Sequence, residues 1–157
     1  MYLMSNDEIT ILNIYNMLNY SRQKDLHEYS RYLLTKQYRN EVLSAIFHNK
    51  ILNSLFHNLL YTVEKDEFDI EYVGKRIKQI KIIYYELFED IHHRFSCIIG
   101  DLDCNETVRS FGDNSFYSLE QALNSENCNL IRRELTAFYQ EYCKIAKKKD
   151  TRRIAAV

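Results

Sequence analysis

A regular run of large apolar residues between Ile70 and Ile91 constrains the fold of this chain more than any other feature. The apolar side chains recur at alternating steps of three and four residues, the spacing of one face of a long helix. The run consists of Ile70, Val73, Ile77, Ile80, Tyr84, Leu87 and Ile91. Such a seam packs against other helices. It therefore predicts a long central helix near residues 70–98, either within an antiparallel bundle, which we favour, or at a dimer seam.

The rest of the chain repeats this helical pattern in shorter segments. The 157 residues include no proline and only three glycines, whereas all-β folds need many tight turns built from these residues. Apolar residues recur at helical intervals over about 6–20, 24–36, 42–63 and 126–149. We predict an all-α fold: a single-domain bundle of about five to six helices over residues 1–149.

Local signals set some of the expected boundaries. Ser5 and Glu8 have the spacing of a capping box, and Asp69 can cap the long central helix. Residues 100–117 hold two of the three glycines and many turn-forming residues, so we expect an irregular loop near 100–117 and a new short helix from Ser118.

The charge and the cysteines indicate a compartment and exclude some functions. The formal net charge is −1, whereas a dedicated nucleic-acid binder usually has a basic excess. The four cysteines form no CxxC pair, which favours free thiols in a reducing environment. No basic segment followed by an apolar run opens the sequence, and no stretch has the roughly 18 apolar residues of a membrane helix. We therefore expect a cytoplasmic protein without a membrane association. Abundant Ile, Asn, Lys and Tyr suggest an AT-rich genome, bacterial or viral.

One short motif points to an enzymatic alternative. Arg22, His27 and Tyr29 have the spacing R-x4-H-x-Y, which resembles the signature of HEPN-domain ribonucleases. The resemblance implies a helical dimer in which Arg22 and His27 face RNA across a cleft. There, His27 would transfer a proton from a ribose 2′-hydroxyl and Arg22 would stabilise charge on the phosphate. The motif departs from the family at Gln23, where the family usually has Asn, and in lying after only one predicted helix. We prefer the exposed start of a second helix and keep the ribonuclease as the alternative.

Other catalytic or metal-binding patterns are incomplete. Glu89 and His92 form one E-x-x-H step, whereas di-iron bundles need two such steps and further carboxylates. The sequence has no nucleophile elbow and no phosphate-binding glycine loop. We predict no metal site and no cofactor, and we favour a protein that is not an enzyme.

The C-terminal segment is strongly basic. Its cations suit either a phosphate backbone or an acidic partner, but they also stabilise a helix C-terminus on their own, which is the interpretation we prefer. We expect residues 150–157 to form a flexible basic tail. The residues that could contact nucleic acid are Lys147, Lys148, Lys149, Arg152 and Arg153.

Tyrosine is the last unusual feature, with 13 residues and no tryptophan. Tyrosine is enriched at protein interfaces. We therefore predict a small regulator, adaptor or immunity-type accessory factor that binds another protein, a second copy of itself included. The predicted partner-binding residues are Tyr72, Tyr84, Tyr85, Tyr139 and Tyr142.

Overall fold

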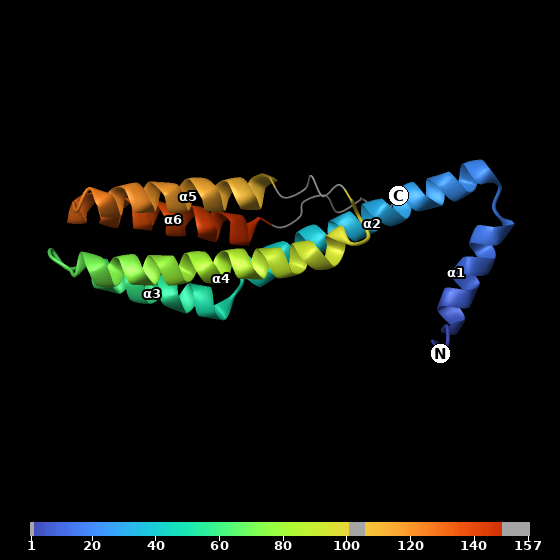
Figure 1. The fold of residues 1–157 in the computed structure, drawn as a ribbon, viewed down its shortest axis with the longest axis horizontal. Helices are drawn as coiled ribbons and strands as arrows, with labels where there is room; N and C mark the ends of the chain where they lie inside the picture. Colours follow the sequence, from blue (N-terminus) through green and yellow to red (C-terminus); the bar gives the residue numbers. More distant parts are fainter. Residues whose placement is uncertain (1, 101–105, 149–157) are drawn as a thin grey trace. The chain divides into compact units, whose positions relative to one another are not determined.

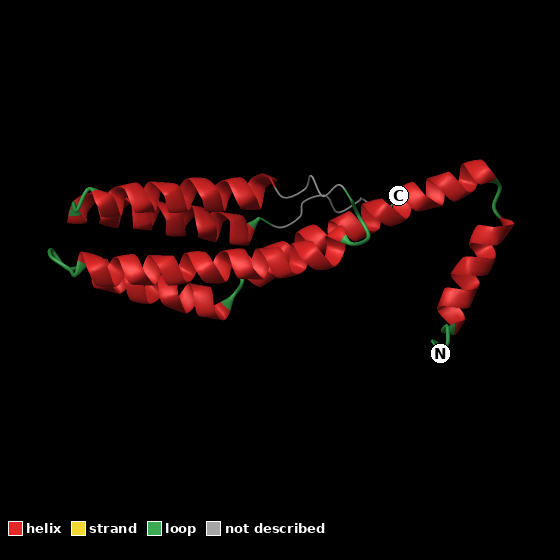
Figure 2. Cartoon of the chain, in the orientation of Figure 1, coloured by secondary structure: helices red, strands yellow, loops and turns green. Residues whose placement is uncertain are grey.

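The structure is a computed structural model that describes residues 2–100 and 106–148, and all regular secondary structure within them is helical (Figure 2). This confirms the all-α prediction. The described helices are α1 (Asn6–Met17), α2 (Tyr20–Phe47), α3 (Lys50–Val63), α4 (Ile70–Ser96), α5 (Glu106–Asn124) and α6 (Cys128–Lys147).

The chain divides into two compact units, Met1–Gln37 and Tyr38–Val157. The boundary falls inside α2, so that the first part of this helix belongs to an N-terminal hairpin with α1 and the last part belongs to the larger unit. A single domain over residues 1–149 stays a prediction. The predicted tail, residues 150–157, lies outside the described residues.

The larger unit is a four-helix arrangement of α3 to α6. α3 packs against α4, α4 against α5, α5 against α6 and α6 against α3, which closes a ring around one core (Figure 1). The end of α2 joins this core through Tyr38, Val42, Ile46 and Phe47. The bundle predicted from the apolar seam is therefore present.

The seam of α4 follows the core as predicted, with one shift. Val73, Ile77, Ile80 and Tyr84 are buried, but the next buried residue is Phe88 and not Leu87. A straight helix has 3.6 residues per turn, so a strict heptad pattern drifts off the buried face and a step of four restores it.

Aromatic side chains fill much of the core. The ring of Phe56 on α3 lies 5.1 Å from that of Phe138 and 5.0 Å from that of Tyr142 on α6. The buried hydroxyls have backbone acceptors, since Tyr84 donates to the carbonyl of Val108 at 2.6 Å and Tyr142 donates to that of Ile46 at 2.5 Å. Both tyrosines can therefore be buried without an unsatisfied polar group.

The predicted caps at Ser5 and Asp69 are confirmed. A third cap, at Asn49, shows that one predicted helix is in fact two. The Ser5 hydroxyl accepts from the Glu8 N–H, and Glu8 accepts from the Ser5 N–H. Asp69 caps α4. The pattern over 42–63 is not one helix, because α2 ends at Phe47 and the Asn49 side chain caps α3. The apolar spacing continues across this break because both helices face the same core.

The prediction of an irregular loop near 100–117 is wrong over residues 106–117, which are helical. α5 begins at Glu106 and continues through Gly112 and Ser118, so no new helix begins at Ser118. A Cβ atom at Gly112 would lie 2.6 Å from Cε1 of Tyr84. This glycine therefore marks the close packing of α5 on α4, since the side chains at a contact set how near two helices approach.

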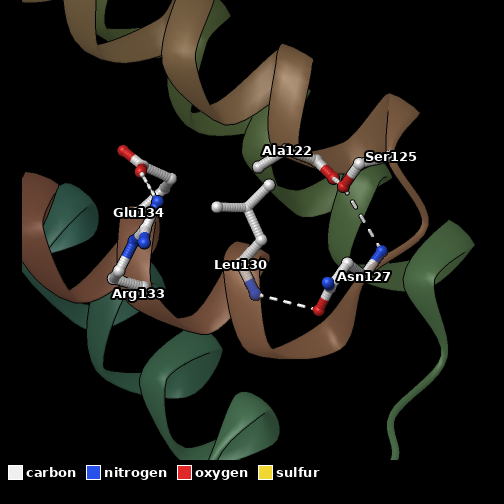
Figure 3. A network of polar contacts seen from close by, with 6 residues as sticks. All are labelled: Ala122, Ser125, Asn127, Leu130, Arg133 and Glu134. Atoms are coloured by element: carbon white, nitrogen blue, oxygen red, sulfur yellow. Dashed lines mark hydrogen bonds and ion pairs between the residues drawn. The ribbon is translucent and has the colours of Figure 1, made fainter.

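The turn between α5 and α6 is held by short polar side chains (Figure 3). The Ser125 hydroxyl donates to the carbonyl of Ala122 at 2.6 Å, and Asn127 Oδ1 accepts from the Leu130 N–H at 3.2 Å. These contacts satisfy backbone groups at both helix ends.

Candidate functional site

The N-terminal hairpin, residues 2–37, holds many large apolar side chains and buries none of them. Met17 on α1 is 88% exposed and Ile11 is 61% exposed. Apolar side chains are also exposed on the first part of α2. Together, the exposed apolar residues of the two helices are Ile9, Ile11, Leu12, Ile14, Met17, Tyr20, Tyr29, Tyr32 and Leu33.

The apolar residues of α1 surround the helix. At 3.6 residues per turn, Ile11, Leu12 and Tyr15 share one side. By the same spacing, Ile9, Ile14 and Met17 lie on the opposite side. Polar residues, among them Thr10 and Asn13, lie between them, so α1 is mixed in polarity but has apolar side chains on opposite sides. Covering both sets of apolar side chains would need neighbours from more than one direction.

The first of these sides lines an apolar groove between α1 and α2, with a volume of about 560 Å³. The two helices diverge from the turn that joins them (Figure 1), and the groove lies on their facing sides. Its lining residues are Met4, Glu8, Ile11, Leu12, Tyr15, Leu26, His27 and Ser30.

A few polar contacts hold the hairpin turn. The Tyr15 hydroxyl lies 3.2 Å from His27 Nε2, and the Gln23 side chain donates to the Tyr15 carbonyl at 2.9 Å. Asn19 Oδ1 accepts from the Arg22 N–H at 3.0 Å, which caps the start of α2. The turn is therefore tied by hydrogen bonds, whereas the groove above it is apolar.

The other end of α1 is set by its capping box. The Ser5 N–H, followed by the Tyr2 hydroxyl at 2.8 Å, holds the pKa of Glu8 below its ordinary value. Both groups hydrogen-bond the charged carboxylate, so Glu8 is ionised and the cap is formed at neutral pH.

The three residues of the ribonuclease-like motif all lie on the hairpin but have separate partners. Arg22 forms an exposed ion pair with Asp25 at 3.2 Å, and His27 contacts Tyr15. The ring of Tyr29 stacks on that of Tyr32, with 6.4 Å between centroids. Their grouping into a catalytic site stays a prediction.

The structure separates the five predicted partner-binding tyrosines into core and surface. Tyr84 and Tyr142 are buried, and burial raises the pKa of each phenol. Tyr85 is half-buried; burial, followed by its hydrogen bond to Asp113, raises its pKa.

The other two tyrosines reach the surface. Tyr139 is half-buried beside His57, with its hydroxyl 3.0 Å from His57 Nε2, and burial raises its pKa. Tyr72 is exposed, and the guanidinium of Arg76 lies 5.3 Å from its ring. We leave Tyr84 and Tyr142 out of the candidate surface because a partner cannot reach them in this fold.

Candidate metal ligands have other partners. Glu89 forms an ion pair with Arg109 at 3.8 Å, and His92 Nδ1 lies 3.0 Å from the Tyr38 hydroxyl. Within residues 2–100 and 106–148, no group of three or more His, Cys, Asp or Glu side chains could hold a metal ion.

Only part of the predicted basic surface is described. Lys147 at the end of α6 and the following Lys148 are exposed. Lys149, Arg152 and Arg153 lie outside the described residues. Binding of nucleic acid by this segment stays a prediction.

A second groove, of about 570 Å³, runs between α4 and α5 of the bundle. Ile77, Ile82 and Leu123 line it, together with an ion pair of 2.6 Å between Lys81 and Glu120. Those two side chains come from the two facing helices, so the ion pair links the walls of this groove.

Comparisons with protein-family models, with curated proteins and with solved structures found no match to this chain. None of the helices in the described part of the chain combines the length and the apolar character needed to cross a membrane. The candidate site therefore stands on its own geometry. Sequence reasoning did not select the hairpin, although one signal was available: apolar residues between Ile9 and Leu18 occupy every side of the predicted helix.

Proposed function

We propose that this protein acts by binding another protein through the exposed apolar surface of its N-terminal hairpin. The observation that carries the proposal is that α1 is apolar on opposite sides and yet has no buried residue. We therefore propose Ile9, Ile11, Leu12, Ile14 and Met17 as the contact residues, in place of the tyrosines of the bundle core.

The energetic reason is the cost of leaving this helix uncovered. Isolated helices of fewer than about 12–15 residues are marginal in water, and α1 has 12 residues. Fully burying one large aliphatic side chain contributes about 1.5–3 kcal/mol. A partner that covers several of these side chains would therefore stabilise α1 substantially and gain affinity at the same time.

This mode of action fits a small helical regulator, adaptor or accessory factor of the cytoplasm. The bundle then serves as a stable scaffold, since most of its own large apolar side chains are buried in its core. No step of the proposed function needs a cofactor or a reaction.

Site-specific photo-cross-linking tests the proposal. A photoreactive amino acid replaces Ile14 in cells that express the chain naturally, and Ile51, an exposed isoleucine on α3, is the matched control position. We expect a defined protein adduct from position 14 that mass spectrometry identifies and that Ile11→Asp abolishes. The absence of an adduct at position 14, or the same adducts from position 51, would contradict the proposal.

A further inference from the structure

We infer that the hairpin binds a second copy of itself. This inference rests on the proposed function and names the partner of the same surface. Three observations on the hairpin support it: an apolar groove, three exposed apolar side chains on the outer side of α1, and opposite charges on the two helices.

The first two observations are geometrical. The groove side of α1 has Ile11, Leu12 and Tyr15, and the outer side exposes Ile9, Ile14 and Met17 beside the polar Thr10 and Asn13. In a two-fold symmetric contact, the same patch serves both copies, so the outer side of one α1 can enter the groove of its partner and the reverse. The product is a four-helix arrangement in which each α1 is covered from two directions, so that the exposed apolar side chains on both sides of the helix are buried.

The third observation is the distribution of charge. α1 carries Asp7 and Glu8 and no basic residue, a net charge of −2. The first part of α2, residues 20–37, carries four basic residues (Arg22, Lys24, Arg31, Lys36) and two acidic residues (Asp25, Glu28), a net charge of +2. Packing α1 of one copy against α2 of the other therefore brings opposite charges together in both halves of the contact.

The same charges disfavour other occupants. Anionic membranes and nucleic acids attract surfaces rich in Lys and Arg. The apolar helix α1 has neither residue, and the charges of the whole hairpin cancel. A second copy needs no further property of the partner, because the hairpin supplies both complementary sides.

Sedimentation equilibrium of the full chain tests the inference. We expect a reversible dimer whose dissociation constant rises at least about 100-fold in Ile11→Asp, a loss of about 2.7 kcal/mol. Ile51→Asp is the matched control, because Ile51 is 63% exposed and Ile11 is 61% exposed. We expect the control to dimerise like the natural chain.

A charge-swap experiment covers the case in which Ile11→Asp simply unfolds α1. Asp7→Lys with Thr10→Lys makes α1 positive, and Lys24→Glu with Arg31→Glu makes the first part of α2 negative. Each double variant alone should be monomeric, because like charges then face each other across the contact. Their equimolar mixture should form a heterodimer, because both halves of the contact become attractive again.

The outcomes separate this inference from the proposed function. A natural chain that stays monomeric, or a dimer unaffected by Ile11→Asp, overturns the inference while a cross-linked partner of another sequence still supports the proposed function. A mixture that stays monomeric also overturns it. Binding of the monomer to anionic vesicles would assign the surface to a membrane and overturn both.

Discussion

The two parts of α2 show how differently one helix can be used. Up to Gln37, none of its large apolar residues is buried, and Tyr29 and Leu33 are exposed. From Tyr38 on, its apolar face is buried, with Val42 and Ile46 in the core. Both parts are helical, so local propensity does not separate them. The second part contributes to the core of the larger unit, and packing of this kind supplies most of the stability of protein helices.

The same contrast holds for the hairpin and the bundle as units. The bundle has a core of interlocked aromatic rings, whereas α1 and the first part of α2 share an open groove. We therefore expect substitutions of large side chains to be costly in the bundle and nearly neutral in the isolated hairpin. The following experiments test that expectation, in order of effect.

The largest effect should come from the bundle core. Phe56→Ala should lower the free energy of unfolding by about 3–5 kcal/mol, because it leaves a cavity between α3 and α6. Ile14→Ala should change it by no more than about 0.5 kcal/mol when the chain is monomeric. Urea denaturation of dilute protein measures both values. Equal losses would show that the hairpin is packed as tightly as the bundle.

The next largest effect should be a loss of bundle stability at alkaline pH. Burial raises the pKa of Tyr84 in the folded state, so above pH 10, the ordinary value, the unfolded chain loses the phenol proton first. Stability is then full below pH 10 and falls as pH rises, by up to about 1.4 kcal/mol per pH unit for Tyr84.

Tyr84→Phe sharpens this measurement. The variant should be less stable at pH 7, because the carbonyl of Val108 loses its donor, but its stability should fall less steeply above pH 10. Urea denaturation between pH 8 and 11 compares the slopes. Identical slopes in the two proteins would show that the raised pKa of Tyr84 does not cause the loss of stability at high pH.

Two helical glycines provide a matched pair of smaller effects. Gly112→Ala should destabilise by about 1–3 kcal/mol, since its Cβ would overlap the buried ring of Tyr84. Gly74→Ala should stabilise by about 0.5–1 kcal/mol, because its nearest neighbour is a Leu123 methyl at 3.8 Å. Thermal unfolding followed by circular dichroism measures both. A stabilising Gly112→Ala would mean that α5 and α4 can move apart at no cost.

We expect neither the protein nor its His27→Ala variant to cleave RNA. His27 contacts Tyr15, and Arg22 contacts Asp25, so each group of the ribonuclease-like motif has a partner within the hairpin. Purified protein and its His27→Ala variant should leave a labelled RNA equally intact. Cleavage that disappears in the variant would reinstate the enzymatic alternative and make the hairpin an active site.

Much of the helical architecture could be predicted because its signals are local. The seam of α4 and the caps at Ser5 and Asp69 depend on residues within a few positions of each other. The course of α5 could not be predicted, because Gly112 is read as a turn signal unless Tyr84 is known to lie against it. Which of the tyrosines are buried could not be predicted either, because a tyrosine at a core position and one at a surface position look alike in the sequence.

By itself, the sequence determined that the fold is helical and where α1 and α4 begin, since spacing and capping act over single turns. Only the tertiary structure decided which apolar residues are buried in a core and which are left exposed. Burial depends on neighbours far apart in the sequence: Tyr142 is covered by α2 and α3, whereas Ile9 and Met17 have no such neighbours within the hairpin.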